Sequence, residues 1–111
     1  MASFGDFIKK EREKKGWTQT EFGAKIGINS SAVSRIENNT KQLSPKKLSQ
    51  LSELLEIKID KIKELYYADK FAKEAYINGC PETAFMVAEQ NIRYLKSKDL
   101  KQGKINFKLH E

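Results

Sequence analysis

The segment from residue 18 to residue 38 constrains the fold of this chain more than any other part. Thr18 and Glu21 have the spacing of a capping box, in which each side chain accepts the backbone N–H of the other at the start of a helix. Gly27 stands where helices commonly end in the left-handed conformation, and Asn29 is suited to cap a second helix. The segment therefore predicts two short helices, near 18–26 and 29–38, joined by a tight turn.

The apolar residues of this segment predict which faces of the two helices are buried. Phe22 and Ile26 are four residues apart and share one side of the first helix, where Gly23 leaves room for a close approach. Val33 and Ile36 predict the inner side of the second helix. The outer side is left with Ser30, Ser31, Ser34 and Arg35. Side chains of this kind are suited to hydrogen bonds with base edges and phosphates.

The order of these residues resembles a known family. The pattern Thr-Gln-x-Glu-Phe-x-x-x-Ile-Gly-Ile, followed by Val-Ser-Arg-Ile-Glu-Asn, is similar to the helix-turn-helix of the phage-repressor-like (Xre/Cro/C1-type) transcription regulators. The resemblance runs from Phe4 to about Ile59. It implies an all-α fold: a lambda-repressor-like helix-turn-helix domain of four to five helices, here followed by a C-terminal helical arm.

The resemblance also implies which residues bind DNA. Gln19 is expected to turn its amide toward a phosphate and to brace the start of the second motif helix, the recognition helix. Ser30 and Ser31 open that helix, where side chains reach base edges, and Ser34 is expected to contact backbone or base. Arg35 is expected to point outward and to read a guanine, with a phosphate contact as its alternative. For the glutamine and the serines the alternative is an ordinary surface or capping role.

The polar loop after the recognition helix is expected to lie along the sugar-phosphate backbone. Asn38 and Asn39 offer donors there, and Lys41 adds positive charge. The alternative for a lysine in this loop is simple solvation.

Arg12 and Glu37 are interpreted as structural residues. The resemblance implies that they pair, which would hold the first helix of the chain against the recognition helix by charge-assisted hydrogen bonds. Trp17 is expected to fill the junction between the first helix and the helix-turn-helix. Neither of these expectations involves contact with DNA.

Composition favours a small binding protein over an enzyme. The 111 residues contain one cysteine and one histidine, which exclude an intramolecular disulfide and a zinc site built from this chain alone. The unpaired Cys80 favours a reducing cytoplasm and is expected to be a small packing residue, with a redox role as the alternative. The sequence has no long apolar run for a membrane and no catalytic motif. We therefore expect a cytoplasmic protein that is not an enzyme and needs no cofactor or metal.

The charge is unevenly distributed along the chain. Residues 1–47 contain ten Lys and Arg against five Asp and Glu, whereas residues 48–92 contain five against eight. Residues 93–108 are basic again, with six against one. Basic ends around a mildly acidic middle are consistent with one surface that faces a nucleic acid and a second that does not. A solvated surface is the alternative explanation of the charge pattern.

Three segments are predicted along the chain. Residues 1–59 form the helix-turn-helix domain, residues 60–98 form a helical dimerisation arm with apolar residues at helical spacing, and residues 99–111 form a basic tail that is flexible or an edge strand. Part of the arm, Ala-Lys-Glu-Ala-Tyr-Ile-Asn-Gly-Cys-Pro-Glu-Thr, somewhat resembles the controller-type regulators encoded beside DNA methyltransferases. The arm has more apolar surface than a short domain covers, which favours a homodimer.

The expected function is that of a sequence-specific regulator that binds double-stranded DNA as a homodimer on a pseudo-palindromic operator. The alternative is a protein-interaction module on the same helical fold. Such a module would be an antitoxin whose arm neutralises a toxin enzyme, or a coactivator that does not read bases.

Overall fold

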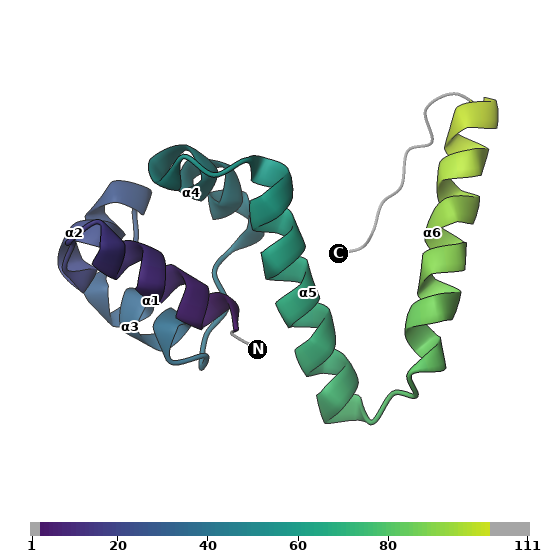
Figure 1. The fold of residues 1–111 in the computed structure, drawn as a ribbon, viewed down its shortest axis with the longest axis horizontal. Coiled ribbons are helices and arrows are strands. Elements are labelled where there is room, and N and C mark those ends of the chain that lie inside the picture. Colours follow the sequence, from purple (N-terminus) through teal and green to yellow (C-terminus); the bar gives the residue numbers. More distant parts are fainter. Residues whose placement is uncertain (1–2, 103–111) are drawn as a thin grey trace. The chain divides into compact units, whose positions relative to one another are not determined.

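The computed structural model describes residues 3–102, and the regular elements within that range are helices (Figure 1). They are α1 (Phe4–Lys14), α2 (Gln19–Ile26), α3 (Ser30–Glu37), the short 3-10 helix η1 (Pro45–Lys47), α4 (Leu48–Leu55), α5 (Ile59–Asn78) and α6 (Thr83–Gln102). Contacts divide the chain into two compact units, Met1–Lys73 and Glu74–Glu111. No helix within residues 3–102 is both long enough and apolar enough to cross a membrane.

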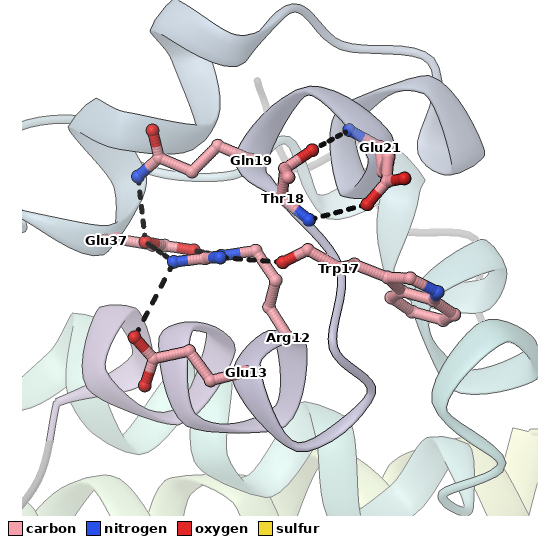
Figure 2. Close-up of polar contacts among 7 residues, drawn as sticks. All are labelled: Arg12, Glu13, Trp17, Thr18, Gln19, Glu21 and Glu37. Carbon is pink, nitrogen blue, oxygen red and sulfur yellow. Dashed lines mark hydrogen bonds and ion pairs between the residues drawn. The ribbon is translucent and has the colours of Figure 1, made fainter.

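Capping boxes start the first two helices. At α1, Ser3 Oγ accepts the N–H of Asp6 at 3.1 Å, and Asp6 Oδ2 accepts the N–H of Ser3 at 3.3 Å. At α2, Thr18 Oγ1 accepts the N–H of Glu21 at 3.0 Å, and Glu21 Oε1 accepts the N–H of Thr18 at 2.8 Å (Figure 2). Each box satisfies two backbone groups that have no partner within the helix. The box predicted at Thr18 is thereby confirmed.

The turn between α2 and α3 is the tight one that the sequence predicts. Gly27 ends α2 with a φ of 76°, in the left-handed region that glycine adopts without strain. Asn29 Oδ1 then accepts the N–H of Ala32 at 2.8 Å and caps α3. At Gly23 a Cβ atom would clash with the carbonyl oxygen of Ile28, so a residue with a side chain does not fit there. The two helices of the motif can therefore approach each other closely.

One hydrophobic core fills the first unit. Its buried residues come from α1 to α5 and from the loop before η1: Phe4, Ile8, Phe22, Ile26, Val33, Ile36, Leu43, Leu48, Leu51, Leu55, Ile62 and Tyr66. The hydroxyl of Tyr66 donates to the carbonyl oxygen of Leu43, and its ring meets the edge of Phe4 at 5.2 Å between centroids. The start of α5 therefore belongs to the helix-turn-helix core, beyond the boundary expected at residue 59.

The second half of the chain differs from expectation at two places. α6 continues to Gln102, past the expected end at residue 98, because nothing before Gly103 interrupts a helix. Cys80 is exposed, so the expectation that it is a small packing residue is wrong for this chain by itself. It follows Gly79, which has a φ of 63° and comes directly after the exposed end of α5 at Asn78. The rest of the predicted tail, 103–111, lies outside the described residues.

Candidate nucleic-acid interface

The side chains of α3 divide between an inner and an outer face. Ser30, Ser31 and Arg35 are exposed, and Ser34 is half-buried. The other four residues of the helix are buried, namely Ala32, Val33, Ile36 and Glu37. The polar residues that the sequence predicts for DNA binding therefore include three that face solvent from one short helix.

A buried ion pair ties α3 to α1. Arg12 Nε donates to Glu37 Oε2 at 2.6 Å, and Arg12 Nη2 donates to Glu37 Oε1 at 3.1 Å (Figure 2). The side chains are 11% and 2% exposed, respectively, so water screens the pair little. This two-pronged geometry fixes direction as well as distance. The structural pair that the resemblance implies is confirmed.

The same arginine also reaches the chain between α1 and α2. Arg12 Nη1 donates to the carbonyl oxygen of Trp17 at 2.8 Å. Its hydrogen bond to Glu37 raises the pKa of the Arg12 guanidinium above its ordinary value, against an opposing effect of burial. Trp17 itself is half-buried and packs its ring 6.4 Å from that of Phe22, with the ammonium of Lys25 4.8 Å above it. Trp17 thus fills the junction, as predicted.

Gln19 adds a third element to this cluster. Its Nε2 donates to Glu37 Oε1 at 3.0 Å, so the first residue of α2 is bonded to the last residue of α3 (Figure 2). The side chain therefore supports the end of the recognition helix, whereas it was expected to support the start of that helix. The amide nitrogen carries two hydrogens, and one is used by Glu37. The second is available to a phosphate, so the predicted contact with DNA is compatible with this bond.

The loop after α3 has a defined conformation. Thr40 donates from both its backbone nitrogen, at 2.9 Å, and its hydroxyl, at 3.2 Å, to the carbonyl oxygen of Arg35. Asn39 has a φ of 65°, a left-handed conformation that asparagine tolerates better than most residues. Asn38, Asn39 and Lys41 are all exposed. The three loop residues predicted to contact the DNA backbone therefore lie on the surface beside the end of the recognition helix.

Sequence reasoning missed one residue of this region. Lys73, in the C-terminal half of α5, donates from Nζ to Asn39 Oδ1 at 3.1 Å. The two residues are 34 positions apart, so no helical spacing indicates the contact. Only the path of α5 past the loop could have revealed it. Among the described residues, no group of three or more His, Cys, Asp or Glu side chains is arranged to hold a metal ion.

Comparison with solved structures identifies several similar proteins. The P22 c2 repressor, solved with a synthetic operator, is 24% identical, with a TM-score of 0.51; the match covers 56% of this chain and 94% of that one. SinR, described as a master regulator for biofilm formation and solved with DNA, is 30% identical over 53% of this chain and 95% of its own, with a TM-score of 0.47. The restriction-modification controller protein C.Esp1396I is 30% identical over 62% and 92%, with a TM-score of 0.47.

A second structure of SinR shows it in complex with the SinI protein, at 25% identity over 85% of this chain and 98% of that chain, with a TM-score of 0.48. No curated protein sequence matches the chain.

Residues 8–62 match the family model described as "Helix-turn-helix". The matched range begins in α1 and ends in α5, so it contains Arg12, Gln19 and Glu37 as well as the whole of α3. The family consists of transcription regulators and not of enzymes. This match shows that the chain belongs to the Xre-type helix-turn-helix family of DNA-binding transcription regulators.

Proposed function

We propose that the protein binds a pseudo-palindromic operator in double-stranded DNA, sequence-specifically and as a homodimer, in the cytoplasm. The observation that carries this proposal is the division of α3. Ser30, Ser31 and Arg35 face solvent, while Glu37, the last residue of the helix, is buried and bonded to both Arg12 and Gln19. A helix held in this way can present its exposed side chains to base edges without adjusting its position on binding.

Charge supports the same proposal. Residues 1–47, which include α1, α2 and α3, contain ten basic side chains against five acidic ones. A dimer that makes ~6–10 phosphate contacts should lose orders of magnitude in affinity between low and moderate salt. We assign the backbone contacts to Gln19, Asn38, Asn39 and Lys41, and the base contacts to residues on the outer face of α3, Ser34 included.

Selection from random duplexes tests the DNA-binding part of the proposal. After rounds of selection, gel-shift titration should show a preferred sequence with two related half-sites, and its affinity should fall steeply with salt. A protein that binds selected and random duplexes equally well would contradict sequence-specific binding. It would instead favour an interaction module.

The homodimer is supported by apolar side chains that α6 leaves uncovered. Phe85, Ile92 and Leu95 recur at helical spacing and are 49%, 51% and 41% exposed. A two-fold axis would bring the same face of a second copy onto this one, because such an interface is self-complementary. The arm of residues 60–98 would then space the two recognition helices about one DNA turn, ~34 Å, apart.

A single charge on α6 tests the dimer. Ile92→Asp should convert the protein to a monomer at micromolar concentration, as measured by light scattering, and should weaken binding to the paired half-sites. Gln90→Asp places the same charge on the opposite side of the same helix and should leave the dimer intact. If the wild-type protein is a monomer at that concentration, the dimer is refuted.

The same uncovered face favours the alternative function. An antitoxin or another interaction module would use Phe85, Ile92 and Leu95 to bind a different protein. In that case the isolated protein would be a monomer, and the exposed face would bind the partner protein. A toxin-like reading frame beside the gene would support this alternative, whereas a methyltransferase and endonuclease pair would support a controller.

A further inference from the structure

A polar contact joins α5 to the loop that follows the recognition helix. Lys73 Nζ donates to Asn39 Oδ1 at 3.1 Å and forms an ion pair with Asp69 Oδ2 at 2.9 Å, one turn earlier on α5. An ammonium group has three hydrogens, so the two interactions do not compete. The Asp69 side chain is 15% exposed and that of Lys73 is 42% exposed. The carboxylate of Asp69, which is the more buried of the two groups, therefore holds the ammonium group of Lys73 close to the loop.

The carbonyl end of the Asn39 side chain is confined from a second direction. A Cβ atom built on Gly5 of α1 would lie only 2.7 Å from Asn39 Oδ1, so this oxygen sits directly over the glycine. The backbone of Asn39 is left-handed as well, with a φ of 65°. The Oδ1 atom is thereby placed between α1 and Lys73.

The orientation of this amide determines what it can bind. A phosphate oxygen accepts hydrogen bonds and does not donate them, so only the Nδ2 end of an asparagine can bond it. A lysine ammonium only donates, so it selects the Oδ1 end. With Oδ1 turned toward Lys73, the two hydrogens on Nδ2 are left for an acceptor outside the protein.

We propose that Lys73 is a positioning residue for DNA binding, which fixes the amide of Asn39 so that Nδ2 donates to a phosphate of the duplex. The proposal rests on the proposed function, because it takes this loop as a contact to the DNA backbone. Lys73 acts through Asn39 and not by its own charge, since Asp69 at 2.9 Å already neutralises the ammonium group. Residue 73 would thus make α5 a support for the DNA-binding loop.

Affinity for a selected duplex, measured by fluorescence anisotropy across a salt series, tests this role. Lys73→Met should weaken binding on the order of tenfold, as one modest hydrogen bond lost in each half-site would. Asn39→Ala should cause a similar loss, and the double variant should bind no more weakly than either single variant. Lys73→Arg, which keeps a cationic donor, should restore most of the affinity. Thermal unfolding of each variant checks that the fold is intact.

Lys63→Met is the matched control, because Lys63 is an exposed lysine of the same helix. It removes the same charge and should leave the affinity nearly unchanged. The salt dependence separates positioning from direct contact: loss of a lysine that touches phosphate lowers the slope of log K against log salt by about 0.9 for each contact. Positioning leaves the slope as it is, because Asn39 carries no charge.

Three results would overturn the proposal. A Lys73→Met variant that binds as well as Lys63→Met shows that Lys73 has no part in binding. A reduced slope, with losses that add in the double variant, makes Lys73 a direct phosphate contact. A wild-type protein that selects no duplex removes the proposed function and this inference with it, and the absence of wild-type binding distinguishes that failure from the other two.

Discussion

Arg12→Met is expected to lower the free energy of unfolding by about 3–5 kcal/mol, the usual cost of leaving one partner of a buried ion pair alone. Methionine retains most of the apolar stem of arginine, so the change removes the charge and the hydrogen bonds more than the packing. For a small domain with a total stability of about 5–15 kcal/mol, such a loss is large. The variant should therefore lose a substantial fraction of its stability.

The structure explains why the loss is of this size. Glu37 accepts three hydrogen bonds, at 2.6 and 3.1 Å from Arg12 and at 3.0 Å from Gln19, and its side chain is 2% exposed. Without Arg12 the carboxylate keeps one neutral donor and cannot reach water. Each hydrogen bond to a charged group contributes about 1.5–3 kcal/mol. Two such losses agree with the expected range.

Urea denaturation followed by far-ultraviolet circular dichroism measures the effect, with Lys14→Met as the control. Lys14 pairs with Glu11 at 3.3 Å on the same helix, but its side chain is 64% exposed, so its loss should cost less than about 1 kcal/mol. The double variant Arg12→Met, Glu37→Met should recover much of the stability, because an apolar pair replaces the ions. The reasoning is refuted if Arg12→Met costs no more than Lys14→Met.

Three further predictions concern other positions. Gly23→Ala should destabilise the fold by about 1–3 kcal/mol in the same assay, because the new methyl group meets the carbonyl oxygen of Ile28; an unchanged urea midpoint would contradict this. Burial raises the pKa of Tyr66 above its ordinary value of 10.0, so the tyrosine ionises at lower pH in the unfolded chain than in the folded one. The free energy of unfolding should therefore fall as the pH rises above about 10, and Tyr66→Phe should make that fall less steep. Arg35→Ala should cost about 1–3 kcal/mol of operator affinity and relax one base preference per half-site; equal weakening on all duplexes, with a lower salt slope, would indicate a phosphate contact instead.

The local features of the helix-turn-helix could be predicted from the sequence because the groups involved are close together along the chain. The capping box joins Thr18 to Glu21, three positions apart, and the cap from Asn29 to the N–H of Ala32 has the same spacing. Gly27 has the left-handed φ that its place after a helix indicates. These contacts form within a few residues of one helix end, so they can be predicted without knowing how the helices pack.

Contacts between distant residues were predicted only where the family resemblance supplied them. The pair of Arg12 and Glu37 is one example. The bond from Gln19 to Glu37, 18 positions apart, and that from Lys73 to Asn39, 34 apart, depend on how the helices cross. No residue spacing encodes a crossing of that kind. The sequence also did not predict that Cys80 is exposed, because exposure depends on which other parts of the chain pack near the end of α5.

The buried ion pair and the outer face of α3 use different residues. Within the part of the chain that the structure describes, the side chains of Ser30, Ser31 and Arg35 take no part in the hydrogen bonds that hold the helices together, whereas Glu37 holds both α1 and α2. Surface substitutions of this type usually change stability by less than about 0.5 kcal/mol. The residues at 30, 31 and 35 can thus vary with little cost in stability. Under the proposed function, a new operator preference could then be introduced without rebuilding the domain.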